Sequence, residues 1–83
     1  MKVLYFAWVR QRTGTGEEEI ELPEGVATVG DLAAHLCARD EGYQSAFENM
    51  SIIRAAVDQE HVALDHPLAG AREVAFFPPV TGG

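Results

Sequence analysis

Hydrophobic residues occupy both alternating faces of two segments, one near each end of the chain. Residues 2–9 contain valine, leucine, tyrosine, phenylalanine and tryptophan, and residues 73–77 combine valine and alanine with two phenylalanines. These β-branched and aromatic side chains are typical of strands, in which successive side chains point to opposite faces. Strands that are apolar on both faces usually have both faces covered, so we predict two strands here whose two faces both call for cover.

Three more strands and a loop are predicted between these two segments. Turn residues at 12–16 precede an alternating stretch in which Ile20 and Leu22 point inward, which suggests a hairpin with its second strand at an edge. Residues 43–50 have no clear hydrophobic period and are predicted to form a loop with room for one helical turn. The three further strands are predicted over residues 17–22, 51–57 and 61–64.

One segment has the pattern of an amphipathic helix. Thr28 is a good N-cap residue, and Asp31 stands three positions later, as in a weaker form of the capping box. The helix should run to about Asp40, with Gly42 at its C-terminal stop. Its apolar stripe follows the helical period and consists of Val29, Leu32, Ala33, Leu36 and Cys37.

A single helix can cover only one face of the sheet. The other face should therefore expose an apolar patch, and such patches on small domains often mark protein interfaces. An alternative is that residues 43–50 fold over this face instead. The patch would contain Leu4, Phe6, Trp8 and Phe77, or the residues that alternate with them.

The chain ends in a segment that is not expected to fold. Pro78 and Pro79 should stop strand pairing and hold the backbone extended. We therefore predict a domain over residues 1–79 and an extended, flexible tail over residues 80–83. An extended tail of this length reaches about 13 Å, and the last two glycines have no side chain to obstruct a narrow channel. A frayed chain end is the alternative.

Composition narrows the possible partners and compartments. The chain has 83 residues and a formal net charge of −7, with 6 Lys and Arg against 13 Asp and Glu. This charge disfavours binding to nucleic acid or anionic lipid and favours a basic protein surface. The single Cys37 cannot form an internal disulfide, so we expect a reducing compartment, the cytoplasm. No apolar run approaches the ~20 residues needed to span a membrane.

No set of side chains in the sequence has the spacing of a catalytic or metal site. The three histidines and Cys37 do not match a zinc pattern, and Cys37 fits the apolar stripe of the helix. Glu17 to Glu21 are better explained as a solvated strand face. Any covalent chemistry should therefore belong to the terminal carboxylate, which is ionised at pH 7 and must be activated by a partner.

The C-terminal sequence resembles a known family. EVAFFPPVTGG at residues 73–83 is similar to the C-terminal signature of the sulfur carrier, or small, subunit of molybdopterin synthase, the MoaD family. Matches to this family extend over essentially the whole chain: KVLYFA at 2–7, TVGDL at 28–32, AAVDQE at 55–60 and DHPL at 65–68. The resemblance implies an α+β fold, the ubiquitin-like β-grasp, with a mixed sheet of four to five strands packed on one main helix.

The resemblance also implies a function. An ATP-dependent activating enzyme would adenylate the Gly83 carboxylate, and sulfur would then replace an oxygen to give a thiocarboxylate. The large synthase subunit would transfer this sulfur to cyclic pyranopterin monophosphate, within a heterotetramer. The chain itself would bind no cofactor or metal and would not be catalytic alone. The residues implied to contact the partner are Val80, Thr81, Gly82, Phe77, Phe6 and His61.

The chain departs from the family pattern at four positions, and three other functions are alternatives to the one that the resemblance implies. The family usually has Gly-Asp where this chain has Ala71 and Arg72, Asn is common at Asp58, and an apolar residue is usual at His61. A sulfur carrier for another pathway, such as thiamine thiazole synthesis, and a ubiquitin-like modifier share the fold and the two final glycines. A β-grasp binding module with an inert tail is a third possibility.

Overall fold

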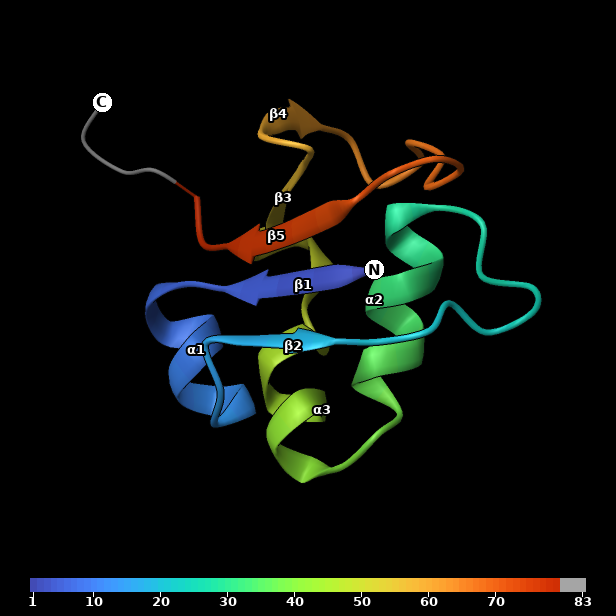
Figure 1. The fold of residues 1–83 in the computed structure, drawn as a ribbon. Coiled ribbons are helices and arrows are strands. Elements are labelled where there is room, and N and C mark those ends of the chain that lie inside the picture. The colour runs from blue at the N-terminus through green and yellow to red at the C-terminus, as the bar shows by residue number, and fades with distance from the viewer. Residues whose placement is uncertain (80–83) are drawn as a thin grey trace.

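The structure, a computed structural model, is built on one five-stranded mixed sheet, and it describes residues 1–79 (Figure 1). The strand order is β2-β1-β5-β3-β4; β1 and β5 are parallel, and the other neighbours are antiparallel. The predicted tail, residues 80–83, lies outside the described residues. The strands are β1 (Lys2–Tyr5), β2 (Glu17–Glu19), β3 (Arg54–Val57), β4 (Glu60–Val62) and β5 (Glu73–Phe77).

Helices pack against one face of this sheet and enclose the core. The described helices are α1 (Ala7–Thr13), α2 (Val29–Cys37), α3 (Glu41–Phe47) and a 3₁₀ turn, η1 (Met50–Ile52). Every second residue of the central strands points into the core, as strand geometry requires. The inward strand residues Val3, Tyr5, Ala55, Val57, Val74 and Phe76 form one cluster with Val29, Leu32, Leu36, Tyr43 and Phe47 of the helices.

The first predicted strand is only half right, because residues 7–13 form α1 instead. Ala7 has φ 53°, in the left-handed region, and turns the chain out of β1. The amides of Val9 and Arg10 then donate to the Phe6 carbonyl, and Val9 is fully buried. Gly14, with φ 84°, ends the helix in the left-handed conformation that glycine adopts without strain.

The stretch predicted as a loop at 43–50 mostly belongs to the helix α3. Tyr43, Ala46 and Phe47 are buried at positions i, i+3 and i+4. Asp40, expected to end the preceding helix, instead caps α3, because its Oδ1 accepts the Tyr43 amide at 3.0 Å. Gly42 lies inside α3 rather than after α2, and a Cβ there would lie 2.6 Å from the Arg12 carbonyl oxygen.

The remaining elements follow the predictions with shorter bounds. The last strand, 73–77, is confirmed residue for residue, whereas the strands expected over 17–22, 51–57 and 61–64 are each shorter. The capping box of α2 is confirmed. Thr28 Oγ1 accepts the Asp31 amide at 3.1 Å, and Asp31 Oδ2 accepts the Thr28 amide at 3.1 Å. The α+β class is therefore confirmed, but α2 is accompanied by two further helices.

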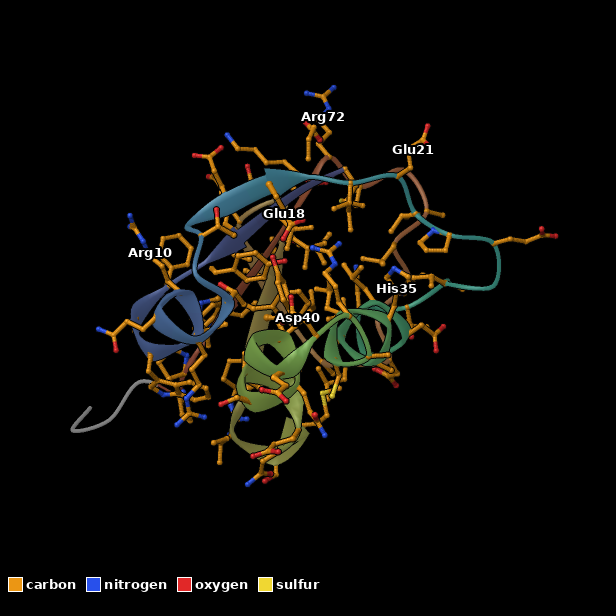
Figure 2. The ribbon with its side chains drawn as sticks, turned by 90° about the horizontal axis from the view of Figure 1, so that it is seen from below. Arg10, Glu18, Glu21, His35, Asp40 and Arg72 are labelled. Atoms are coloured by element: carbon orange, nitrogen blue, oxygen red, sulfur yellow. The ribbon has the colours of Figure 1, made fainter. Side chains whose placement is uncertain are left out.

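Glu18 differs from the solvated acidic strand face that we expected. It lies opposite Val3 and points toward the helices, whereas Glu21 points away from the body (Figure 2). Its carboxylate accepts hydrogen bonds from the hydroxyls of Tyr5 and Tyr43. It also forms an ion pair with Arg39, whose Nη1 lies 2.6 Å from Glu18 Oε1. Glu18 thereby joins the edge strand β2 to β1, to α3 and to the residues that follow α2.

The surroundings of Glu18 favour its ionised form. Burial by itself would raise the pKa of the carboxyl, but hydrogen bonds from Tyr43, Arg39 and Tyr5 outweigh it and lower the pKa. Burial, followed by the bond to Glu18, raises the pKa of Tyr5. The carboxylate therefore stays charged and both phenols stay neutral at pH 7, so all three contacts are present together.

We predict that Glu18→Gln lowers the free energy of unfolding by about 1–2 kcal/mol at pH 7. The pKa of the Glu18 carboxyl is lower in the folded state than in the unfolded state, where it is about 4.3. Its contribution to the free energy of unfolding is therefore fully present above this unfolded-state pKa and is lost as the pH falls through the folded-state pKa. The difference between the wild type and the variant should therefore shrink between pH 5 and pH 3. Urea denaturation across this range measures it.

The matched control for this experiment is Glu19→Gln, on the opposite face of the same strand. Glu19 is 76% exposed and pairs with the N-terminal amine, so its replacement should change the free energy of unfolding by at most about 0.5 kcal/mol. Equal losses in the two variants, or a difference that does not depend on pH, would contradict the role assigned to Glu18.

Candidate functional site

The face of the sheet opposite the core cluster carries a continuous row of mostly apolar side chains. The strand register places Leu4 beside Ala75, Ala75 beside Ala56, and Ala56 beside His61. Leu4, Ala56 and Ala75 alternate with core-cluster residues of their strands, so they and His61, the cross-strand neighbour of Ala56, lie on the outer face. Ala56 and Ala75 are small and only 7% and 8% exposed between their larger neighbours. The sequence analysis did not assign Ala56 to this row. The alternation of Ala56 with its strand neighbours Ala55 and Val57 is the signal that could have placed it there.

Two phenylalanines lie beside this row, where the parallel strands β1 and β5 end. Phe6 directly follows β1, has an extended backbone, and donates its amide to the Phe76 carbonyl at 3.1 Å. Its side chain is 48% exposed. Phe77 is the last residue of β5 and is partly buried. The register Tyr5–Phe76 therefore brings Phe6 next to Phe77 at the same end of the sheet.

His61 completes this group of aromatic side chains. Its ring centroid lies 5.2 Å from that of Phe77, with 45° between the ring planes, and the residue is exposed. The structure thus brings together Phe6, Phe77 and His61, the three partner-contact residues predicted within its described part. We call the six residues Leu4, Phe6, Ala56, His61, Ala75 and Phe77 the open face.

The structure decides between the two coverings that the sequence left open. The alternative in which residues 43–50 cover the exposed aromatics is wrong, because α3 packs on the inner face. Phe47 lies 5.0 Å from Phe76 and 6.2 Å from Tyr5 between ring centroids. Trp8 does not belong to the open face; it lies in α1, where Arg12 packs over its ring at 4.5 Å.

The backbone next to Phe6 is strained. A left-handed conformation costs a non-glycine residue about 1–2 kcal/mol, and Ala7 adopts it directly after Phe6. This turn ends β1 after Tyr5, so that α1 turns away and the Phe6 ring remains exposed at the strand end. Strain of this kind often occurs where a site must be held in one geometry.

Charged groups surround the open face, and two of the cations among them are paired with carboxylates. Lys2 pairs with Glu17 at 3.3 Å, and the N-terminal amine pairs with Glu19 at 3.2 Å. Arg54, the cross-strand neighbour of Phe77, donates to the carbonyls of Ser51 and Ile53. A partner that covers the open face therefore meets an apolar centre with ion pairs and the Arg54 guanidinium at its margin.

The turns at the other end of β5 accommodate the departures from the family pattern. Asp58 and Gln59 both have positive φ, as a two-residue type I′ hairpin requires. Asp58 Oδ1 accepts the amides of Glu73 and Arg72, and these bonds lower the pKa of its carboxyl. The left-handed position before β5 is filled by Gly70, so Ala71 and Arg72 need no special conformation.

The remaining predicted site residues cannot be placed. Val80, Thr81, Gly82 and Gly83 lie outside the described residues, which end with Pro78 and Pro79 directly after β5. Among residues 1–79, no group of three or more histidine, cysteine or acidic side chains is arranged to hold a metal ion. No helix in this part of the chain is long and apolar enough to cross a membrane.

Comparisons with known proteins agree with this fold. The model of the ThiS family matches residues 3–83. The molybdopterin synthase sulfur carrier subunit of Escherichia coli is 45% identical over 100% of this chain and 99% of its own length. That of Haemophilus influenzae is 32% identical over the same shares.

The fold of this chain is also similar to the folds of solved structures. SAMP1 from Haloferax volcanii has a TM-score of 0.70 at 29% identity, over 100% of this chain and 98% of that one. A putative molybdopterin converting factor, subunit 1, from Pyrococcus furiosus has a TM-score of 0.67 at 35% identity, over 95% of both chains. The predicted β-grasp fold is therefore confirmed, and the chain belongs to the ThiS family, as a relative of the molybdopterin synthase sulfur carrier subunits.

Proposed function

We propose that this chain is the sulfur carrier subunit of a molybdopterin synthase and gives its sulfur to cyclic pyranopterin monophosphate. The observation that carries the proposal is the position of Phe77. It is the last residue of β5 and part of the open face, and it precedes Gly83 by only six residues. Docking through the open face would therefore bring the C-terminus to the same partner.

The terminal carboxylate needs chemistry that another protein must supply. A carboxylate with a pKa near 3.5 is ionised at pH 7 and is a poor electrophile. An ATP-dependent activating enzyme would join the Gly83 carboxylate to AMP and release pyrophosphate. A sulfur nucleophile would then displace AMP and leave a thiocarboxylate. In this scheme the chain is not catalytic alone, and ATP is bound by the activating enzyme.

The open face is the proposed contact with the large synthase subunit. Phe6 and Phe77 offer aromatic area at the ends of two paired strands, and buried aromatic anchors commonly dominate interface energetics. Residues Val80 to Gly82 would follow Phe77 into the partner, where an extended tail reaches about 13 Å. The proposed assembly is a heterotetramer with one carrier at each end of a large-subunit dimer.

Two other functions share the Gly-Gly terminus. A carrier for thiamine thiazole synthesis would also end in a thiocarboxylate, but the FFPPV run at residues 76–80 argues against it. A ubiquitin-like modifier would instead join Gly83 to lysines of target proteins. The fold is shared both with SAMP1 and with a putative molybdopterin converting factor, so likeness of fold does not distinguish a modifier from a sulfur carrier. An experiment must distinguish the two functions.

We predict that Gly83 gains a thiocarboxylate when the chain is incubated with its activating enzyme, ATP and a sulfur donor. Intact-protein mass spectrometry should show the replacement of one oxygen by sulfur, located at Gly83 after peptide digestion. The matched control lacks Gly82 and Gly83 and should show no such change. Isopeptide adducts on lysines without any thiocarboxylate would refute the carrier function in favour of a modifier.

We also predict that Phe77→Asp and Phe6→Asp each weaken binding to the large subunit by about 30-fold or more, because each places a charge in an apolar contact. Isothermal titration calorimetry measures the affinity. Circular dichroism should show an unchanged fold, since Phe6 is half exposed and Phe77 is only partly buried.

The neighbouring Phe76 provides the comparison for these two variants. Phe76 is fully buried, so Phe76→Ala should destabilise the fold by about 3–5 kcal/mol. Thermal denaturation distinguishes a core ring from a surface ring in adjacent positions. If Phe77→Asp unfolds the chain as Phe76→Ala does, or binds the large subunit normally, the open face is not the docking surface.

A further inference from the structure

A second surface, separate from the open face, lies on the helical side of the molecule. A groove of about 600 Å³ runs between the end of α2 and α3. Its apolar part includes Ala34, Cys37 and Met50. Ala34 is exposed, and the other two are partly buried. Cys37 and Met50 also pack against the margin of the core, whereas Ala34 points away from it, because the inward positions of α2 are taken by Leu32, Ala33 and Leu36.

Three carboxylates border this groove. Asp40 lies where the chain passes from α2 to α3 (Figure 2), and Glu41 and Glu48 lie at the beginning and just past the end of α3. Glu41 and Glu48 have no hydrogen bond or ion pair with any side chain among residues 1–79. The nearby Arg39 does not neutralise them, because its guanidinium pairs with Glu18.

We propose that this groove is a docking site for a basic amphipathic segment of a partner protein. The segment would place aliphatic side chains against the apolar part of the groove and lysine or arginine beside the three carboxylates. Complementary charge of this kind favours a basic partner and speeds its association. The chain's net charge of −7 disfavours an acidic occupant on the same grounds.

The groove and the open face lie on opposite sides of the sheet. The open face occupies the outer side of the strands, whereas α2 and α3 pack on the inner side and carry the groove on their far surface. Both sites can therefore be occupied together. A partner in the groove would hold the carrier while the open face remains available to another protein, and this inference does not depend on which sulfur pathway the chain serves.

Titration with a defined probe tests this site. The probe is a helical peptide of leucine, lysine and glutamine with all leucines on one face, added to the full-length ¹⁵N-labelled chain. We expect amide shifts concentrated at Ala34, Cys37 and their neighbours, with no comparable shifts on the open face. A peptide in which glutamate replaces every lysine should not bind.

Charge-reversal variants separate a specific groove from general attraction. Glu41→Lys with Glu48→Lys should weaken the lysine peptide about tenfold or more. The matched control, Glu21→Lys with Glu24→Lys, changes the net charge equally, from −7 to −3, at exposed positions outside the groove and should have less than a twofold effect. The spectra of both variants verify that they are folded.

A third variant tests the apolar part of the groove without changing charge. Ala34→Gln keeps a good helix former on α2 but places a larger polar side chain in the groove, so it should weaken the peptide about threefold or more. The proposal is overturned if the peptide does not bind, if its shifts spread over the acidic surface, or if both charge-reversal pairs weaken it equally.

Discussion

The parallel pairing of β1 with β5 is the constraint on which the rest of the structure depends. It places the first and last strands of the chain side by side in the middle of the sheet, with Tyr5 opposite Phe76. Parallel strands need a crossover, and α2 supplies it on the inner face. Because both strands run in the same direction, they end together, and Phe6 and Phe77 lie at one edge of the open face.

Strand alternation then places the side chains of the two consecutive phenylalanines of β5 on opposite faces of the sheet. Phe76 packs between Tyr5 and Phe47 and is fully buried, whereas Phe77 contacts His61 on the open face. The same segment therefore holds the core together and presents a surface. A shift of the register by one residue would exchange the two rings, so core packing also fixes which ring is exposed.

Much of this arrangement could be predicted from local sequence signals. The Pro78-Pro79 pair marked the end of β5, and Thr28 with Asp31 marked the start of α2, because in both cases the signal acts on the adjacent backbone. The helix α1 was missed, since the left-handed turn at Ala7 has no glycine to announce it. The inward position of Glu18 depends on contacts with Arg39 and Tyr43, which lie on other elements, and α3 is held by the packing of its own Tyr43 and Phe47 against Tyr5 of the distant strand β1.

The central position of β5 also has a mechanical consequence. This strand is bonded along its length to β1 on one side and to β3 on the other. A force along the axis of β5 would load the hydrogen bonds of both ladders in shear, so many of them would have to break together rather than one at a time. The position of β5 thus makes the sheet most resistant to force in the direction in which this strand runs.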